Sequence, residues 1–208
     1  ADDLLGTLAI QASARGYQVR IVTGDRDLFQ LVNDHIQVLM PEKGGGKFAL
    51  FDAKGVEDKL GLKPDQVVDY KALAGDASDN IPGVKGIGEK TTVQLLKRFN
   101  TLEELYDRLS EVDERFRRKL IDDRKSALYS QQLATILTDV DLKFSPEQCR
   151  LNQPQIDPII DVLKKLEFKS ILTELPSILS LFEGEPESNS PQVHALELNP
   201  TVTIIESI

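Results

Sequence analysis

The first fifty residues alternate between two patterns of apolar positions. Apolar residues recur at helical spacing up to Gly16, whereas the segment 17–24 is apolar and β-branched, as in a buried parallel strand. The elements predicted here are a helix at 2–15, a strand at 17–24, a short helix at 27–32, and strands at 35–40 and 48–51. Helices that alternate with strands predict an α/β fold with a partial parallel sheet.

From residue 52 onward the pattern is helical. Asp52 is suited to cap a helix, Pro64 to begin one, and Thr101 with Glu104 to form a capping box. The predicted helices span 53–60, 64–74, 89–98, 102–109, 114–137 with a break, and 156–181. We therefore expect a second, mainly helical subdomain.

Two further features set the expected domain boundaries. Three consecutive glycines at 44–46 predict a flexible turn, and the acidic, turn-rich segment 182–192 is typical of a linker. The last residues have a strand-like pattern, as at the start of another domain. The expected division is 1–52, 53–181, 182–195 and 196–208.

Composition narrows the class of protein. The single cysteine, Cys149, excludes a disulfide within one chain and favours a reducing compartment, so we expect a cytoplasmic protein. No apolar run is long enough for a membrane span, and no export signal is visible. Because the only methionine is Met40, we expect the chain to be processed or to be part of a longer protein.

The net charge of −9 at first argues against a nucleic-acid partner. Its distribution is uneven, because residues 81–125 carry 11 Lys and Arg against 9 Asp and Glu. The segments on either side are acidic. This basic middle segment is compatible with a phosphate-binding surface, although so small an excess also occurs by chance.

Three pairs of aspartates are candidates for chemistry. They are Asp2 and Asp3 at a helix start, Asp25 and Asp27 after the buried strand, and Asp76 and Asp79 in "GDASDN". Carboxylates held a few Å apart repel one another unless a cation lies between them, and six carboxylates without His or Cys favour Mg²⁺ or Mn²⁺. Each pair alone also has a structural explanation in helix-dipole or turn chemistry. Only convergence of the pairs in space would indicate a metal site.

The glycine-rich segment 83–91, GVKGIGEKT, differs by one residue from the nucleotide-binding pattern GxxxxGK[ST]. Glu89 stands where that pattern needs lysine, and a helix precedes the segment instead of a buried strand. We therefore expect a helix–hairpin–helix whose glycines let the backbone approach a phosphate. Lys85, Lys90 and Thr91 lie beside the hairpin and would hold a DNA backbone without reading its sequence. An ordinary tight turn between helices is the alternative.

Several of these motifs together resemble one family. "ADDLLGTLA", "VTGDRDLFQLV", "DYKALAGDASDNIPGVKGIGEKT" and "LLKRFNTLEEL" occur in the order and spacing of the 5′-nuclease domain at the amino end of bacterial DNA polymerase I. This domain is a member of the 5′-3′ exonuclease and flap endonuclease family. The resemblance covers residues 1–180. It implies a PIN-like, flap-endonuclease-like α/β core followed by a helix-hairpin-helix element, also called helix-three-turn-helix.

The resemblance implies a role for each candidate residue. The catalytic and metal-binding acids would be Asp2, Asp3, Asp25, Asp27, Asp76 and Asp79, around two Mg²⁺ or Mn²⁺ ions. Duplex DNA would be held by Gly83, Lys85, Gly86, Gly88, Lys90 and Thr91. The backbone carbonyls of Val84 and Gly86 would bind K⁺. The attacking group would be water activated at the metal ions, with no side-chain nucleophile.

The implied activity is 5′-3′ exonuclease and 5′-flap endonuclease cleavage of DNA in replication and repair. The implied partners are 5′-flap or nicked duplex DNA and the polymerase domains of the same parent chain, without a membrane, in the bacterial nucleoid. The family begins well before the position of Ala1, so part of its sheet and of its metal site has no counterpart here. Two alternatives stay open: a catalytically inactive duplex-binding fragment, and a PIN-type ribonuclease, which usually lacks the hairpin.

Overall fold

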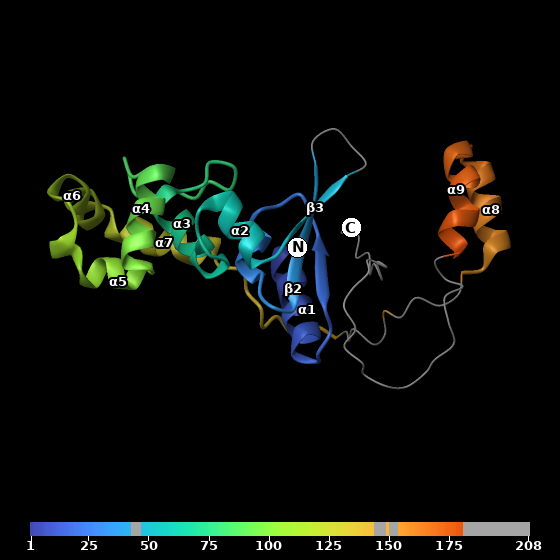
Figure 1. The fold of residues 1–208 in the computed structure, drawn as a ribbon, viewed down its shortest axis with the longest axis horizontal. Helices are drawn as coiled ribbons and strands as arrows, with labels where there is room; N and C mark the ends of the chain where they lie inside the picture. The colour runs from blue at the N-terminus through green and yellow to red at the C-terminus, as the bar shows by residue number, and fades with distance from the viewer. Residues whose placement is uncertain (43–46, 144–148, 150–153, 181–208) are drawn as a thin grey trace. The chain divides into compact units, whose positions relative to one another are not determined.

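The computed structural model describes residues 1–42, 47–143, 149 and 154–180 (Figure 1). These residues belong to two compact units, one within Ala1–Pro146 and one within Glu147–Thr203. The glycine turn expected at 44–46, the linker and the strand-like end of the chain lie outside the described residues. Among the described helices, none combines the length and apolarity needed to cross a bilayer.

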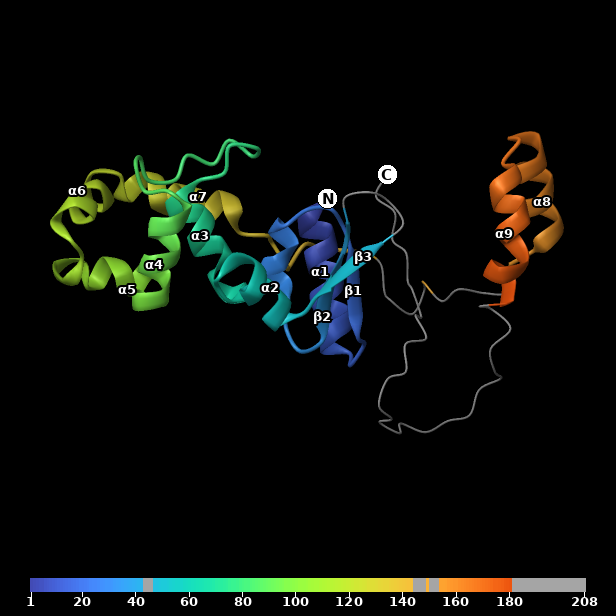
Figure 2. The same cartoon turned by 45° about the horizontal axis from the view of Figure 1, so that its top comes forward.

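The first unit begins with a helix and a small sheet. The elements are α1 (Asp2–Ala14), β1 (Val19–Val22), the 3₁₀ helix η1 (Asp27–Leu31), β2 (Ile36–Pro41) and β3 (Phe48–Phe51). The strand order is β1-β2-β3, with β1 parallel to β2 and β3 antiparallel to β2. Figure 2 shows α1 beside the strands. The partial parallel sheet predicted from the sequence is confirmed.

Buried apolar residues join this sheet to its neighbouring helices. Ile21, Val38 and Phe29 belong to one core cluster with Ala9 of α1 and Val56 of the next helix. Before β2, the Asn33 side chain accepts hydrogen bonds from the backbone N–H groups of residues 35 and 36, which sets the turn that returns the chain to the sheet. The connection between the two parallel strands therefore places η1 directly after the carboxyl end of β1.

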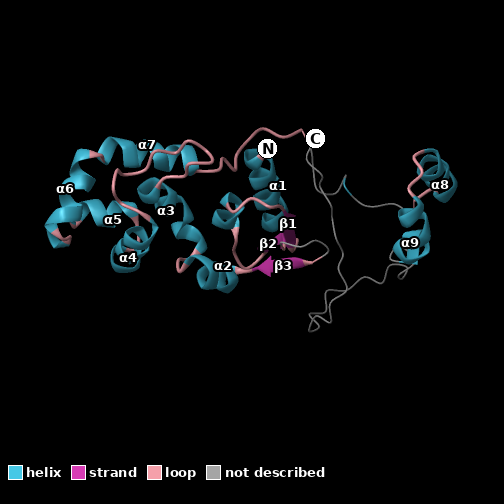
Figure 3. Ribbon diagram, turned by 90° about the horizontal axis from the view of Figure 1, so that it is seen from above, coloured by secondary structure: helices cyan, strands magenta, loops and turns pink. Residues whose placement is uncertain are grey.

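The rest of the first unit is helical (Figure 3). Its elements are α2 (Ala53–Leu60), η2 (Pro64–Gln66), α3 (Val67–Ala74), α4 (Glu89–Phe99), α5 (Leu102–Asp107), η3 (Leu109–Glu111), α6 (Glu114–Asp122) and α7 (Arg124–Ala134). A second core cluster includes Leu73, Leu96, Phe99, Leu105 and Leu120. The helix α3 contributes to this cluster and also packs against α7 and α4.

The side-chain caps predicted at Asp52 and Thr101 are confirmed, whereas the Thr101 N–H bonds to the Phe99 carbonyl, so the Glu104 half of the predicted capping box does not form. The Asp52 side chain accepts a hydrogen bond of 2.7 Å from the Gly55 N–H, and Thr101 accepts one of 3.1 Å from the Glu104 N–H. The break expected within 114–137 falls at Asp123, between α6 and α7. These features depend on residues only three or four positions apart, which is why the pattern was sufficient to predict them.

The single helix predicted for 156–181 is wrong. The chain instead forms α8 (Ile156–Lys165) and α9 (Lys169–Ser180), which constitute the described helices of the second unit. Glu167, between them, has a φ of 57°, and a left-handed residue cannot continue an α-helix. Glycine or asparagine normally signals such a position, and the sequence has neither there.

Candidate functional site

Three of the candidate carboxylates converge. Asp27, Asp76 and Asp79 each place a carboxylate oxygen within 4.8 Å of the others. Asp27 is the first residue of η1, whereas Asp76 and Asp79 lie in the loop after α3. The site thus forms where the segment after β1 meets the loop after α3.

Local hydrogen bonds fix the conformation of the turn before η1 and of the loop after α3. The Asp25 Oδ1 atom accepts a hydrogen bond of 2.9 Å from the Asp27 N–H, and this bond fixes the turn into η1. In the second loop, the backbone groups of Asp76 and Ile81 exchange two hydrogen bonds, of 2.9 and 2.8 Å. The Ser78 N–H and hydroxyl both donate to Asp76 Oδ1. The loop therefore holds the Asp76 carboxylate in a defined orientation.

The sequence reasoning missed Lys71, which lies at the centre of this cluster. Its Nζ atom is 2.8 Å from Asp76 Oδ2 and 3.2 Å from Asp79 Oδ2, and it also pairs with Asp27 Oδ1. The side chain is only 7% exposed. A lysine among the apolar residues of α3 was the available signal, because a buried lysine is almost always paired.

The carboxylates differ in their proton affinity. Burial raises the pKa of Asp27 to about 6, against the lowering effect of the Lys71 ammonium. Hydrogen bonds from Lys71 and then Ser78 lower the pKa of Asp76 to about 2. The pKa of Lys71 is raised, because its bonds to the three carboxylates outweigh the effect of burial. The cluster thus contains a charged ammonium.

The remaining candidate acids lie outside this group. Among the described residues, the only three acidic, His or Cys ligands found this close together are Asp27, Asp76 and Asp79. Asp25 adjoins the group through its bond to Asp27. Asp2 and Asp3 form the first turn of α1, and Asp3 Oδ1 accepts a hydrogen bond of 2.8 Å from the Leu137 N–H. In this structure Asp3 joins the start of α1 to the segment after α7.

The glycine-rich segment forms a close-packed hairpin between α3 and α4. Gly83 is buried, donates its N–H to Ser130 Oγ at 2.9 Å, and accepts a hydrogen bond of 2.7 Å from Ser126. Both serines belong to α7. Val84 is buried as well, and its carbonyl accepts a bond from the Ile87 N–H. These two residues therefore anchor the hairpin within the helical core.

The outer part of the hairpin is exposed and carries two lysines together with Glu89. Lys85, Gly86, Gly88 and Lys90 are exposed, and Thr91 is half-buried. No side chain caps the amino end of α4, which starts directly after Gly88. Its first N–H groups are therefore available to an anion. This geometry fits the predicted phosphate contacts, which stay a prediction.

A second lysine that the sequence reasoning missed bonds the hairpin. Lys119 of α6 donates from Nζ to the Gly86 carbonyl at 2.7 Å, and a Cβ atom at Gly86 would come within 2.5 Å of that nitrogen. The Gly86 carbonyl was one of the two predicted K⁺ ligands. It accepts a bond from an ammonium of the chain itself, and the K⁺ site stays a prediction.

The donor set at the aspartate cluster fits a hard divalent cation. The three carboxylate oxygens are close enough to share one ion, and oxygen-only ligands suit Mg²⁺ or Mn²⁺. Asp27, Asp76 and Asp79 would hold such an ion. The described residues offer neither a thiolate nor an imidazole in this group.

Two protein-family models match consecutive parts of the chain. The model of the 5'-3' exonuclease N-terminal resolvase-like domain matches residues 1–61. The model of the 5'-3' exonuclease C-terminal SAM fold matches residues 62–157. The boundary between them falls in the connection between α2 and η2.

Curated relatives agree with these models. DNA polymerase I of Synechocystis is 43% identical over 181 residues, which cover 84% of this chain and 18% of the relative. The thermostable DNA polymerase I of Thermus thermophilus is 43% identical over 184 residues, which cover 88% of this chain and 21% of the relative. The chain thus spans about a fifth of the length of these relatives.

Solved structures share the fold. T5 5'-exonuclease with bound zinc aligns with a TM-score of 0.59 at 19% identity, covering 66% of this chain and 50% of that one. The catalytic core of Rad2 in complex with a DNA substrate aligns with a TM-score of 0.51 at 20% identity, covering 82% of this chain and 58% of that one. With two family models covering residues 1–157 in order, the chain belongs to the 5'-3' exonuclease family.

Proposed function

We propose that this chain supplies carboxylate ligands and duplex-binding elements to a metal-dependent 5′ nuclease within a longer DNA polymerase I. The substrate would be DNA at the junction between a 5′ single strand and a duplex, as in replication and repair. The observation that carries the proposal is the convergence of Asp27, Asp76 and Asp79 from two distant segments of a 5'-3' exonuclease-family chain.

In this proposal, metal binding and duplex binding take place at two separate sites of the chain. When bound, Mg²⁺ or Mn²⁺ would act as a Lewis acid and promote ionisation of the attacking water. Asp27, Asp76 and Asp79 would position the cation against the scissile phosphate. The hairpin and the amino end of α4 would hold the duplex backbone through N–H groups and lysines. Asp2, Asp3 and a second ion belong to the proposal through the family alone.

A second candidate is that this chain, taken alone, binds duplex DNA without cleaving it. Two observations favour this possibility: Lys71 pairs with all three clustered carboxylates, and Asp2 and Asp3 do not join them. The hairpin, by contrast, is held to α7 by the hydrogen bonds of buried Gly83, and its lysines Lys85 and Lys90 are exposed. DNA binding and cleavage therefore need separate assays.

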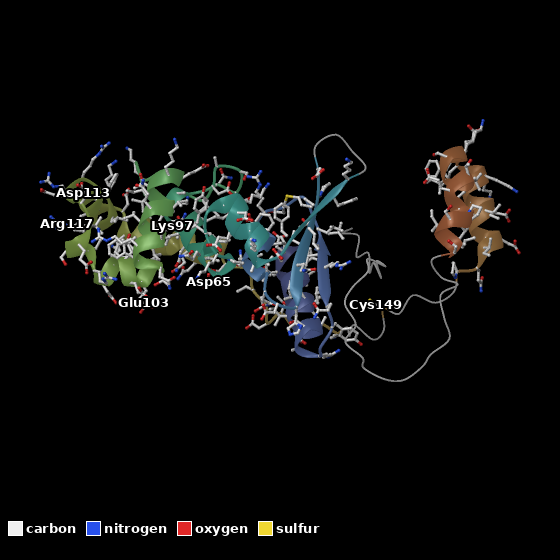
Figure 4. The ribbon with its side chains drawn as sticks, viewed as in Figure 1. Asp65, Lys97, Glu103, Asp113, Arg117 and Cys149 are labelled. Carbon is white, nitrogen blue, oxygen red and sulfur yellow. The ribbon has the colours of Figure 1, made fainter. Side chains whose placement is uncertain are left out.

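The experiment compares this chain with the longer parent chain on a labelled 5′-flap DNA and Mg²⁺. Replacing Asp76 and Asp79 together with Asn should reduce cleavage by the parent chain at least about a hundredfold and leave duplex binding within about threefold. A matched control replaces two exposed aspartates, Asp58 and Asp65, with Asn. Figure 4 labels Asp65.

The outcomes separate the two candidates. Cleavage by both chains contradicts the second candidate, whereas cleavage by the parent chain alone, with duplex binding by both chains, is the result expected if this chain taken alone only binds DNA. Normal cleavage by the Asp76→Asn/Asp79→Asn variant contradicts the metal assignment. Absence of both cleavage and DNA binding in both chains contradicts the proposed function as a whole.

A further inference from the structure

The ammonium of Lys71 occupies the space between the three clustered carboxylates. It donates hydrogen bonds to Asp27 Oδ1 and Asp79 Oδ2 and pairs with Asp76 Oδ2 at 2.8 Å. Those carboxylates are the same three whose oxygens lie within 4.8 Å of one another. One side chain therefore bonds every member of the candidate metal site.

Electrostatics explains why the lysine takes this position. Three carboxylates within a few Å repel one another, and the Lys71 ammonium offsets part of that repulsion. Its side chain is 7% exposed, so water contributes little to its solvation. Lys71 lies in the last turn of α3, only five residues before Asp76. The helix that leads into the acidic loop therefore also carries the positive charge that balances it.

A divalent cation bound by the same oxygens would need the same space. Metal–oxygen distances for Mg²⁺ are about 2.1 Å, so an ion shared by these three carboxylates leaves no room for an ammonium among them. The two cations would also repel each other strongly at such short range. Occupation of the site by the metal and by the Lys71 ammonium is therefore mutually exclusive.

We propose that Lys71 is a tethered competitor of the divalent cation, which keeps the three carboxylates together without metal and must leave them when metal binds. This inference rests on the proposed function, because it takes the cluster to be the metal site. Lys71 acts through the carboxylates and is a positioning residue. It lowers the affinity for metal and makes occupancy depend on displacement of a side chain.

The test measures binding of Mn²⁺ alone to the full 208-residue chain, by electron paramagnetic resonance without DNA. Lys71→Met removes the competitor and should bind Mn²⁺ roughly tenfold more tightly than the unaltered chain. Lys71→Arg retains the positive charge and should restore an affinity close to that of the unaltered chain. Lys97→Met, at an exposed lysine of α4 labelled in Figure 4, removes the same charge elsewhere and should change the affinity less than about twofold.

Two results would overturn the inference in distinguishable ways. Suppose the unaltered chain binds Mn²⁺, Asp76→Asn/Asp79→Asn does not, and Lys71→Met binds no more tightly. The metal site then stands, and the competition is refuted. If Asp76→Asn/Asp79→Asn binds Mn²⁺ as the unaltered chain does, the cluster is not the metal site, and the proposed function fails along with the inference.

A second measurement needs no variant, in case Lys71→Met does not fold. Amine-specific labelling followed by mass spectrometry reports the accessibility of each lysine in the unaltered chain. Saturating Mn²⁺ should increase labelling of Lys71 several-fold and leave Lys97 unchanged, because the displaced ammonium becomes accessible. Unchanged labelling of Lys71 at saturating Mn²⁺ would refute the displacement.

Discussion

Gly75 and Gly83 meet backbone to backbone at the base of the hairpin. A Cβ atom at Gly83 would lie 2.4 Å from the Gly75 nitrogen. Both glycines have a positive φ, which is 63° at Gly83 and 74° at Gly75. A side chain at Gly83 would therefore clash with main-chain atoms and strain the backbone. The hairpin depends on these glycines for its close approach to α3.

The first prediction concerns this contact. Gly83→Ala should reduce the free energy of unfolding by at least about 2 kcal/mol, because the clash adds to the strain of a positive φ. Urea denaturation monitored by circular dichroism measures the change. Gly24→Ala is the control, because an added Cβ there meets nothing within 4 Å, and we expect an effect below about 0.5 kcal/mol. Equal effects of the two changes would contradict the close approach.

The second prediction concerns Asp76 and pH. Its pKa is lowered to about 2, so the folded state binds this proton more weakly than the unfolded state does. The resulting stability is present above about pH 4 and is lost as the pH falls towards about 2. Asp76→Asn lacks this contribution. Between about pH 4 and pH 2, its free energy of unfolding should therefore fall by about 1 to 2 kcal/mol less than that of the unaltered chain.

Urea denaturation in the presence of a chelator, between about pH 5 and pH 2, measures this difference. Asp27 contributes a slope of opposite sign, because its pKa is raised to about 6 and its stabilising effect is lost as the pH rises. That slope lies between about pH 4 and pH 6, which separates the two residues. Parallel curves for Asp76→Asn and the unaltered chain would contradict the assignment.

At the scale of elements, α3 links the two candidate functions. Its last turn carries Lys71, the loop after it carries Asp76 and Asp79, and the Leu73 carbonyl accepts a bond of 2.9 Å from the Val84 N–H in the hairpin. Asp69, earlier in the same helix, accepts bonds from the Leu102 N–H at 2.8 Å and the Gln131 side chain at 2.7 Å. One helix therefore positions both the acidic cluster and the hairpin.

The third prediction concerns the support that α6 gives to the hairpin. Lys119→Met removes the ammonium that bonds the Gly86 carbonyl and should weaken duplex binding about three- to tenfold, because a charge-assisted hydrogen bond is lost. Fluorescence anisotropy with a labelled duplex at fixed salt measures the affinity. Lys97→Met loses the same charge at the far end of α4 and should weaken binding less. Equal losses would indicate a general charge effect without a role for the Gly86 contact.

At the scale of the whole molecule, the two core clusters belong to the first unit. One cluster contains residues of α1, the sheet and α2, and the other contains residues of each helix from α3 through α7. Each cluster therefore spans segments far apart in sequence. Every buried residue of these clusters lies between Ala9 and Ile136. The cluster Asp27, Asp76 and Asp79 also lies within this span.

The fourth prediction follows from this distribution of the core. A chain that ends at Lys143 retains both clusters and the Asp3 bond to the Leu137 N–H, so its thermal midpoint should change by less than about 3 °C. Differential scanning calorimetry of the two chains measures this change. Replacing buried Leu96 with Ala in the shortened chain is the positive control and should lower the midpoint well beyond that margin. A collapse of the transition on truncation would show that the second unit contributes to the core.

The sequence by itself determined what depends on near neighbours. The caps at Asp52 and Thr101, the strand patterns and the existence of a break within 114–137 are set by residues a few positions apart, so periodicity and local hydrogen-bond chemistry were sufficient, whereas the position of the break at Asp123 came from the structure. The break at Glu167 was missed because no glycine marks its positive φ. The identity of the candidate acids followed from residue types and family motifs.

Only the tertiary structure decided which of those acids meet. Asp27 and Asp76 are 49 positions apart, and Lys71, which lies only five residues before Asp76, reaches Asp27 because α3 packs beside η1. Lys119 reaches Gly86 because α6 folds back towards the hairpin. Such contacts arise from packing between elements. The pattern of apolar and polar residues in a single sequence does not show which elements pack together. The aspartates could therefore be named from the sequence, whereas the lysines that bond them and the hairpin were found only in the fold.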